Sequence, residues 1–106
     1  MWKEYQKEKY NREVIESVDG FIVYNRHPDN SVYISELYVT KEARNKGEGK
    51  RLEEILIKKE RPALIFIDID MESNGWELAL IQIVRSANYK YDSTIGNRII
   101  LYKELK

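Results

Sequence analysis

A short stretch of glycines and basic residues, Arg44-Asn45-Lys46-Gly47-Glu48-Gly49-Lys50, has the composition of a site for a phosphorylated ligand. It follows the strand-like run Val32 to Val39 and opens an amphipathic helix that ends before Pro62. The first amides of a helix have no partner inside the helix, and the helix dipole adds positive charge there, so a phosphate can bind. Gly47 and Gly49 lack a Cβ and would let a diphosphate approach the backbone closely. Positive charge surrounds the turn on Arg44, Lys46, Lys50 and Arg51.

The spacing of this turn differs from the common nucleotide-binding motifs. A P-loop requires Ser or Thr directly after its lysine, whereas Arg51 follows Lys50. The dinucleotide fingerprint requires a third glycine where this sequence has Leu52. The alternative to a phosphate site is a basic loop that only joins a strand to a helix.

The composition predicts one folded domain, residues 1–106, because 42% of the 106 residues are hydrophobic and 34% are charged. The formal net charge is zero, which disfavours nucleic acid and anionic membranes as partners. The absence of cysteine excludes disulfides, Cys-metal sites and an acyl-cysteine intermediate. No His/Asp/Glu cluster has metal-ligand spacing, and His27 is expected to be a surface turn residue beside Pro28. No run resembles a signal peptide or a membrane span, so a cytoplasmic protein is expected.

The first half of the chain reads as an N-terminal arm or short helix over residues 1–12, then three strands and a helix. Asp19-Gly20 is a strong hairpin signal between two β-branched or aromatic runs. The helix, from about Gly47 to Lys59, should bury Leu52, Ile55 and Leu56 on one stripe. The three strands are expected at Glu13 to Val18, Phe21 to Asn25 and Val32 to Val39.

The second half reads as a strand, a helix and two further strands. Ala63 to Ile67 is a continuous apolar run, which predicts a central strand covered on both faces. Asn74 and Glu77 resemble the capping pair of a helix, and apolar residues then follow at helical spacing. That stripe is Trp76, Ala79, Leu80, Ile83, Val84 and Ala87. The remaining elements are a short strand at Tyr89 to Tyr91, a turn over Ser93 to Asn97 and a last strand from Arg98 to Leu105.

The resulting order, β-β-β-α-β-α-β-β, predicts an α/β fold around one mixed sheet. From about Glu13 onward the chain resembles the GNAT superfamily of N-acetyltransferases, whose acetyl-coenzyme A turn is Gln/Arg-x-x-Gly-x-Gly/Ala. Here Leu37-Tyr38-Val39 ends the preceding strand and Arg44-x-x-Gly47-x-Gly49 supplies the turn. The resemblance implies a mostly antiparallel sheet with a splayed central parallel pair, Val32 to Val39 and Ala63 to Asp70, and helices packed on it. The strand and two helices that open the usual family domain are expected to be largely missing.

The resemblance also implies roles for particular residues. Pantetheine would pair with the backbone near Leu37, Tyr38 and Val39, and the diphosphate of acetyl-coenzyme A would lie on the amides around Lys46 to Lys50. Cofactor binding is thus expected at Leu37, Tyr38, Val39, Arg44, Asn45, Lys46, Gly47, Glu48, Gly49 and Lys50.

An acceptor amine would attack the thioester in the gap, with a base to take its proton. Glu36 is the candidate base, and an outward-facing strand residue is the alternative. Asp68 and Asp70 are a second candidate pair, whose alternative is a solvated strand end. The tyrosine that the family commonly uses as the acid is missing near Val84 and Arg85, because no tyrosine occurs between Tyr38 and Tyr89.

Tyr89 is then the candidate acid, with packing as its alternative role. The functional prediction is an acetyl-CoA-dependent N-acetyltransferase acting on an amine, with a protein lysine or N-terminus favoured because of the abbreviated acceptor wall. A weakly active or inactive coenzyme A-binding module is the second hypothesis. Trp2 and Tyr5 are candidates for a homodimer surface, with packing against the sheet as the alternative.

Overall fold

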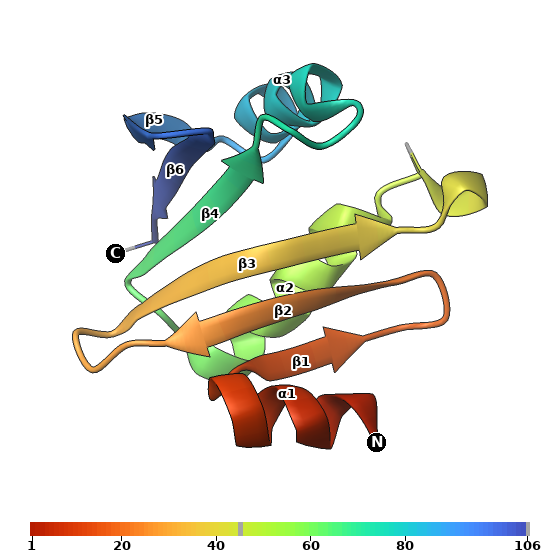
Figure 1. Cartoon of the computed structure of the whole chain (residues 1–106), viewed down its shortest axis with the longest axis vertical. Helices are drawn as coiled ribbons and strands as arrows, with labels where there is room; N and C mark the ends of the chain where they lie inside the picture. The colour runs from red at the N-terminus through yellow and green to blue at the C-terminus, as the bar shows by residue number, and fades with distance from the viewer. Residues whose placement is uncertain (45, 106) are drawn as a thin grey trace.

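The computed structural model describes residues 1–44 and 46–105, in which six strands form one sheet and three α-helices pack around it (Figure 1). Residues 1–12 contain a helix rather than an extended arm. The helices are α1 (Trp2–Tyr10), α2 (Glu48–Glu60) and α3 (Trp76–Ser86), with a short 3-10 turn at Lys41–Ala43. The strands are β1 (Glu13–Glu16), β2 (Gly20–Arg26), β3 (Ser31–Val39), β4 (Leu64–Asp70), β5 (Lys90–Ile95) and β6 (Arg98–Glu104).

The strand order across the sheet is β1-β2-β3-β4-β6-β5, and only β3 and β4 are parallel neighbours. This confirms the predicted mixed sheet with a central parallel pair. The hairpin at Asp19-Gly20 is also confirmed, because Glu16 pairs with Phe21 and the Ser17 amide donates to the Gly20 carbonyl at 2.9 Å.

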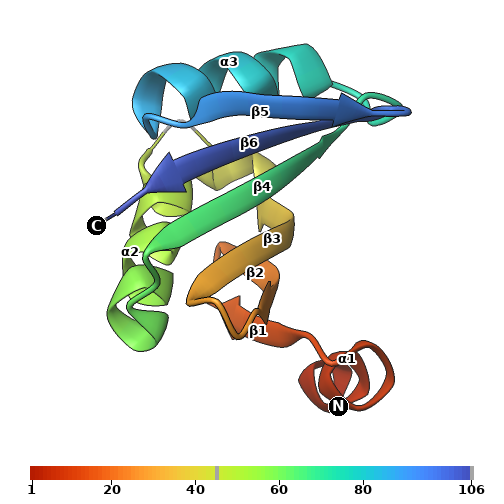
Figure 2. The same cartoon turned by 90° about the vertical axis from the view of Figure 1, so that its left-hand side faces the viewer.

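One face of the sheet carries the main hydrophobic core. On β4 it presents Ile65, Ile67 and Ile69, which cluster with Leu52 and Leu56 of α2. The inner side of α3 packs against the same cluster, so α2 and α3 cover this face, as the edge-on view in Figure 2 shows. We call it the helix face. On the opposite face, Trp2 of α1 stacks edge-on against Phe21 at 4.9 Å between ring centroids, so Trp2 packs onto the sheet.

A β-bulge interrupts β3 at Ser35. Val23 of β2 lies opposite Glu36, whereas the next residue, Tyr24, lies opposite Ile34, so Ser35 is the extra residue. Its hydroxyl donates to the Val23 carbonyl at 3.2 Å. A bulge reverses the facing that simple alternation would give to the residues beyond it.

Three details of the predicted elements are wrong. Asn74 does not cap α3: the N-cap is Gly75, whose φ of 78° and lack of a side-chain cap show that the turn depends on backbone conformation. Ile55 is 43% exposed, because the buried stripe of α2 runs through Glu48, Leu52 and Leu56. β5 extends to Ile95 rather than ending before Ser93, because it pairs with β6 beyond a second bulge.

Candidate functional site

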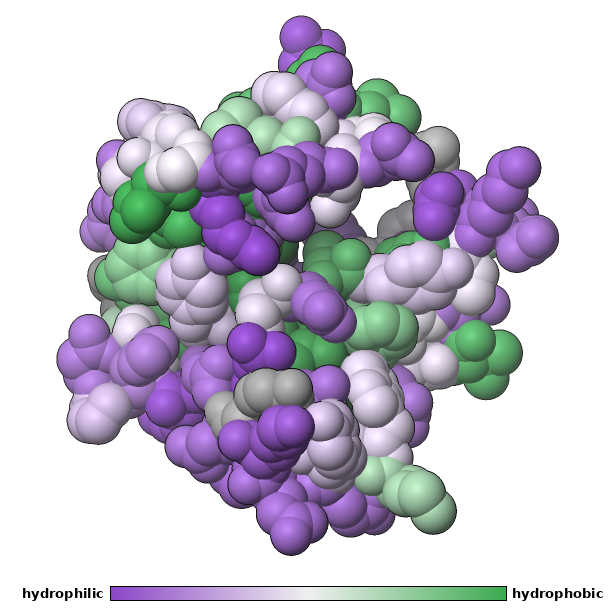
Figure 3. Space-filling model, in the orientation of Figure 1, coloured by the Kyte–Doolittle hydropathy of each residue, from purple (hydrophilic) through white to green (hydrophobic). Residues whose placement is uncertain are grey.

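The central parallel strands separate after a short paired segment. β3 and β4 are paired only from Ser31 with Leu64 to Ile34 with Ile67. Beyond these pairs, β3 stays with β2 as far as Val39, and β4 stays with β6 as far as Asp70. Backbone groups of β3 that point away from β2 beyond Ile34 therefore have no strand partner. Figure 3 shows that the surface is open between the diverging ends of β3 and β4.

The start of α2 lies beside this gap. A Cβ built on Gly49 would be 3.9 Å from side-chain carbons of both Leu37 and Val39 at the end of β3. The Arg51 amide donates to the Gly47 carbonyl at 3.0 Å, so the amides of Glu48, Gly49 and Lys50 precede the helical hydrogen bonds. Donors at the end of a helix and the free edge of β3 are thus side by side.

Gly47, not Gly49, is the glycine that the turn requires by conformation. It is the N-cap of α2 with a φ of 85°, in the left-handed region that disfavours side chains. A Cβ at Gly47 would meet nothing within 4 Å, so the backbone of the turn faces open space. The turn therefore fits a bound diphosphate, both in its donors and in the room above its backbone.

Only part of the positive charge around the turn is available to a ligand. Arg44 donates through Nε to the Val39 carbonyl at 3.0 Å and lies over the Tyr38 ring at 5.9 Å. Arg51 pairs with Glu48 at 2.6 Å. Within the described residues, Lys46 and Lys50 form no ion pair, and Asn45 lies outside those residues.

The side chain of Glu48 has a structural role. It is 7% exposed, accepts a short hydrogen bond from the Ser17 hydroxyl and thereby ties the start of α2 to the β1–β2 hairpin. Its side chain is therefore not available to a cofactor. The group of Glu48 that could still bind one is its backbone amide, which has no partner within the helix.

Glu36 lies on the sheet face opposite α2. It is opposite Val23 in the register and therefore on the same side as Phe21 and Tyr38, which stack at 5.5 Å. It lies beyond the segment of β3 that pairs with β4, and it is exposed. In the described part of the chain its carboxylate has no hydrogen-bond or ion-pair partner, and its role as the base stays a prediction.

Asp68 and Asp70 do share one face, as predicted, but both are engaged. Asp68 accepts from Arg98 at 3.1 Å and from the Tyr33 hydroxyl at 3.2 Å. Asp70 lies 3.9 Å from the same guanidinium and accepts the Glu72 amide at 2.9 Å. These contacts favour a role for both carboxylates in holding the ends of β4 and β6.

Tyr89 lies in the core on the helix face. It is 3% exposed, its hydroxyl donates to Glu53 at 3.1 Å, and Lys103 lies over its ring while pairing with Glu53 at 2.6 Å. Burial, and then the nearby Glu53 carboxylate, raise the pKa of the Tyr89 hydroxyl. This arrangement favours the packing role for Tyr89, and its role as the acid stays a prediction.

The buried phenol predicts a loss of stability in alkali. Because the folded state raises the pKa of Tyr89, the unfolded chain loses that proton first, from about pH 10 upward. The contribution of the Tyr89 hydroxyl to the free energy of unfolding should therefore be constant below that pH. Above it, this contribution should fall by at most about 1.4 kcal/mol per pH unit. Urea unfolding across this range measures the slope. Tyr89→Phe should make the decline shallower, and an unchanged slope would contradict the assignment.

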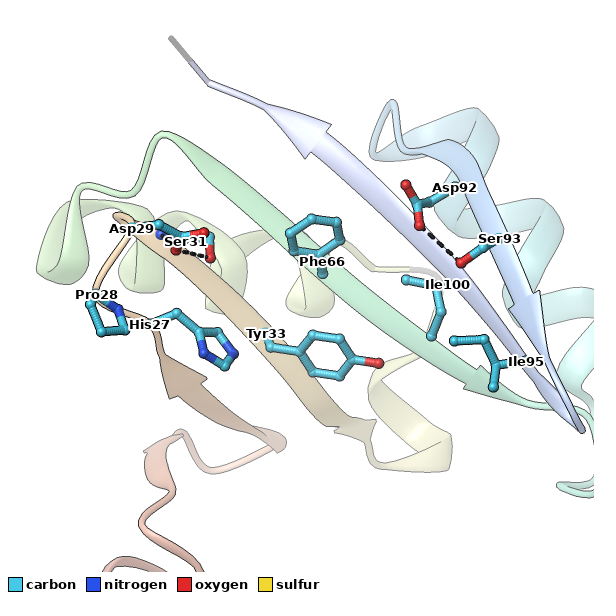
Figure 4. Close-up of a pocket in the computed structure, with 10 residues that line it drawn as sticks. All are labelled: His27, Pro28, Asp29, Ser31, Tyr33, Phe66, Asp92, Ser93, Ile95 and Ile100. Carbon is cyan, nitrogen blue, oxygen red and sulfur yellow. Dashed lines mark hydrogen bonds between the residues drawn. The ribbon is translucent and has the colours of Figure 1, made fainter.

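A shallow hollow of about 620 Å³ lies on the face opposite α2 and α3 (Figure 4). Its floor is the stacked pair Tyr33 and Phe66, with centroids 6.2 Å apart, and His27 meets Tyr33 edge-on at 6.5 Å. Asp29 and Asp92 lie on opposite rims, from the β2–β3 turn and from β5. The prediction that both faces of β4 are covered is therefore wrong: its apolar run is explained by its central position and by aromatic stacking around Phe66.

These rim and floor residues were not identified from the sequence. Alternation along β3 does place the Tyr33 side chain on the other face of the sheet from the buried Val32 and Ile34. No local signal in the sequence shows that this other face stays uncovered. His27 is confirmed as a turn residue, since its amide bonds the Ser31 carbonyl at 2.9 Å.

Solved structures with a similar arrangement of strands and helices include GNAT acetyltransferases. An acetyltransferase of the GNAT family from Staphylococcus aureus Mu50 has a TM-score of 0.64 and 16% identity, over 85% of this chain and 61% of that one. The fold is that of GNAT acetyltransferases. A Bacillus subtilis acetyltransferase in complex with CoA (TM-score 0.65, 18% identity) matches 97% of this chain and 83% of its own. PaiA N-acetyltransferase from Thermoplasma acidophilum in complex with coenzyme A has a TM-score of 0.62 and 23% identity, over 82% of this chain and 54% of that one.

This chain therefore spans less than two thirds of some proteins that share the GNAT fold. No family model and no curated protein matches its sequence. Among the residues described, no group of three or more His, Cys, Asp or Glu side chains could hold a metal ion. None of the described helices is long and apolar enough to cross a membrane.

Proposed function

We propose that this chain binds acetyl-coenzyme A between the start of α2 and the separated ends of β3 and β4, and transfers the acetyl group to an amine. The observation that carries the proposal is the termination of β3–β4 pairing at Ile34 and Ile67, directly beside a helix start with free amides and a left-handed glycine. Two solved proteins of this fold were obtained with coenzyme A.

Different parts of the cofactor would be bound by different groups of the chain, some from the backbone and some from side chains. The amides from Gly47 to Lys50 would bind the diphosphate, with Lys46 and Lys50 adding charge. The free edge of β3 beyond Ile34 would pair with the peptide-like pantetheine. Arg44 occupies the Val39 carbonyl, so we assign it to shaping the turn and not to direct contact with pantetheine.

The role we assign to the chain in the transfer is to accept the proton that the attacking amine loses. The amine nitrogen attacks the thioester carbonyl carbon, the carbon–sulfur bond breaks and the sulfur leaves as thiolate. Glu36 would take the proton that the nitrogen loses, because it is the unpartnered carboxylate at the gap. The thiolate is a fair leaving group without an acid, which is consistent with the buried position of Tyr89.

The acceptor would approach the face opposite α2 and α3. Glu36 lies on this face, as does the hollow around Tyr33 and Phe66, and Tyr33 is about 10 Å from Glu36 along the strand. None of the described helices contributes to the lining of the hollow, which leaves room for a protein segment carrying a lysine or a free N-terminus (Figure 4). We therefore favour a protein acceptor over a small enclosed amine.

A coenzyme A-binding module without turnover is the second candidate. It is favoured by the core position of Tyr89, which leaves no candidate for the family's tyrosine acid in α3. Binding of coenzyme A without thiol release on any amine would select this function.

Gly47→Ala tests the backbone site, with Gly75→Ala as a matched control. Both glycines are helix N-caps with positive φ and open space around them, so each substitution should destabilise the fold by about 1–2 kcal/mol. Gly47→Ala alone should weaken coenzyme A binding about tenfold or more, as expected for losing a charge-assisted hydrogen bond. Calorimetric titration measures both affinities. Wild-type protein that gives no heat at millimolar coenzyme A would contradict the cofactor assignment.

A further inference from the structure

Helix α3 is apolar on two sides. Its inner side, with Trp76, Leu80, Ile83 and Ala87, packs against the core. Its outer side exposes Leu78, Ile81 and Val84, at 60%, 48% and 42%. Figure 2 shows α3 at the β5 edge of the sheet, with its far side turned away from the other elements.

The outer side of α3 is unusual for a surface that faces water. No charged residue occurs between Glu77 and Arg85, which stand at the two ends of this outer side, so the middle of the outer side is apolar, whereas an exposed helix face normally carries charges throughout. β5 also carries an exposed aromatic residue, Tyr91, which is 61% exposed. Tyr91 lies opposite the buried Leu101 in the register and so on the same face of the sheet as α3. Exposed apolar residues gathered on one side of a helix mark an interaction site.

The residue order on this outer side is symmetric about Ile81. Leu78 and Val84 stand three positions before and after it, about 60° to either side on the helix. Glu77 and Arg85 stand four positions before and after it, about 40° to either side. Both charged residues are exposed, and neither forms an ion pair within the part of the chain that the structure describes.

We propose that this face of α3 binds the α3 of a second copy of the chain. Two antiparallel helices related by a two-fold axis at Ile81 bring Leu78 of each copy to the same level as Val84 of the other. The same axis brings Glu77 of each copy to the level of Arg85 of the other, and both charged residues lie closer to the centre of the contact than the two apolar ones. A two-fold contact must be self-complementary, and this surface has opposite charges at matching levels with apolar residues beside them.

The two-fold axis also accounts for the exposed edge of β5. β5 is the last strand of the sheet and runs in the opposite direction to α3, so in a pair with antiparallel α3 helices the two β5 edge strands are also antiparallel (Figure 2). An unpaired edge with exposed Tyr91 and Ile95 is otherwise a liability for a monomer. The contact is on the opposite end of the sheet from α1, so it replaces Trp2 and Tyr5 as the proposed dimer surface.

Charge reversal tests this contact through its symmetry. The wild-type chain, residues 1–106, should sediment as a dimer. Arg85→Glu should raise the dimer dissociation constant about tenfold, because each of two contacts then joins two carboxylates. The double variant Glu77→Arg with Arg85→Glu should restore the wild-type constant, since the ion pairs form again with their partners exchanged.

Two controls separate the contact from effects on the fold. Lys58→Glu makes the same charge change on an exposed position of α2 and should leave the dimer unchanged. Ile81→Glu should give a monomer with an unchanged circular dichroism spectrum, because Ile81 is already half exposed. A monomeric wild type overturns the proposal. So does a dimer that Arg85→Glu leaves unchanged, or one that the double variant fails to restore.

Discussion

Glu36→Gln should lower the rate of acetyl transfer by about 10²- to 10⁴-fold while leaving coenzyme A affinity unchanged, the usual range for general-base assistance. The amide cannot accept the proton that the attacking amine must lose. Its shape is nearly that of the carboxylate, and the side chain has no structural partner among the described residues. The measurement is thiol release from acetyl-coenzyme A with a panel of protein and polyamine acceptors.

The pH dependence distinguishes lost base catalysis from other causes. The deficit of Glu36→Gln should shrink as pH rises, because more of the acceptor amine is then already neutral. Asp68→Asn is the matched control: it also neutralises a carboxylate on this face, but one that Arg98 and Tyr33 already hold. Turnover that survives Glu36→Gln and is lost in Asp68→Asn would move the base from β3 to β4.

Patterns that repeat along the chain made much of the fold predictable. The hairpin at Asp19-Gly20, the helical stripe through Leu52 and Leu56, and the stop at Pro62 each combine a local signal with a periodic one. These signals predict the order and type of the elements, and the order indicates one mixed sheet. The central parallel pair was implied by the resemblance to the GNAT superfamily. The turn before α2 was predicted from the glycines and basic residues that cluster between a strand-like run and an amphipathic helix.

Features that depend on contacts between distant segments were not predictable. The bulge at Ser35 decides which face Glu36 takes, and it exists only in the pairing of β3 with β2. Tyr89 is buried because Glu53 and Lys103, far away in sequence, meet it between α2 and β6. The different roles of the two glycines in the turn were not predictable either. The sequence spacing gave Gly47 and Gly49 the same role, whereas of these two only Gly47 has a positive φ.

A different glycine should give the largest effect on folding. A Cβ at Gly20 would overlap the carbonyl oxygen of Tyr38 and lie 3.2 Å from the Val39 Cα and 3.3 Å from Leu52. Backbone cannot yield as a flexible side chain can, so Gly20→Ala should destabilise the protein by about 3 kcal/mol, the upper end of the range for overpacking. Urea unfolding measures this loss.

Gly49→Ala is the informative counterpart, because its Cβ would make only ordinary contacts at 3.9 Å and would add up to about 1 kcal/mol of helix stability. Gly20 lets β2 lie directly against the end of β3, and that end faces the start of α2. Gly20→Ala should therefore weaken coenzyme A binding together with stability, whereas Gly49→Ala should not lower stability whatever it does to binding. If Gly20→Ala were as stable as the wild type, β2 would not press on the end of β3 in this way, and the gap would need another explanation for its shape.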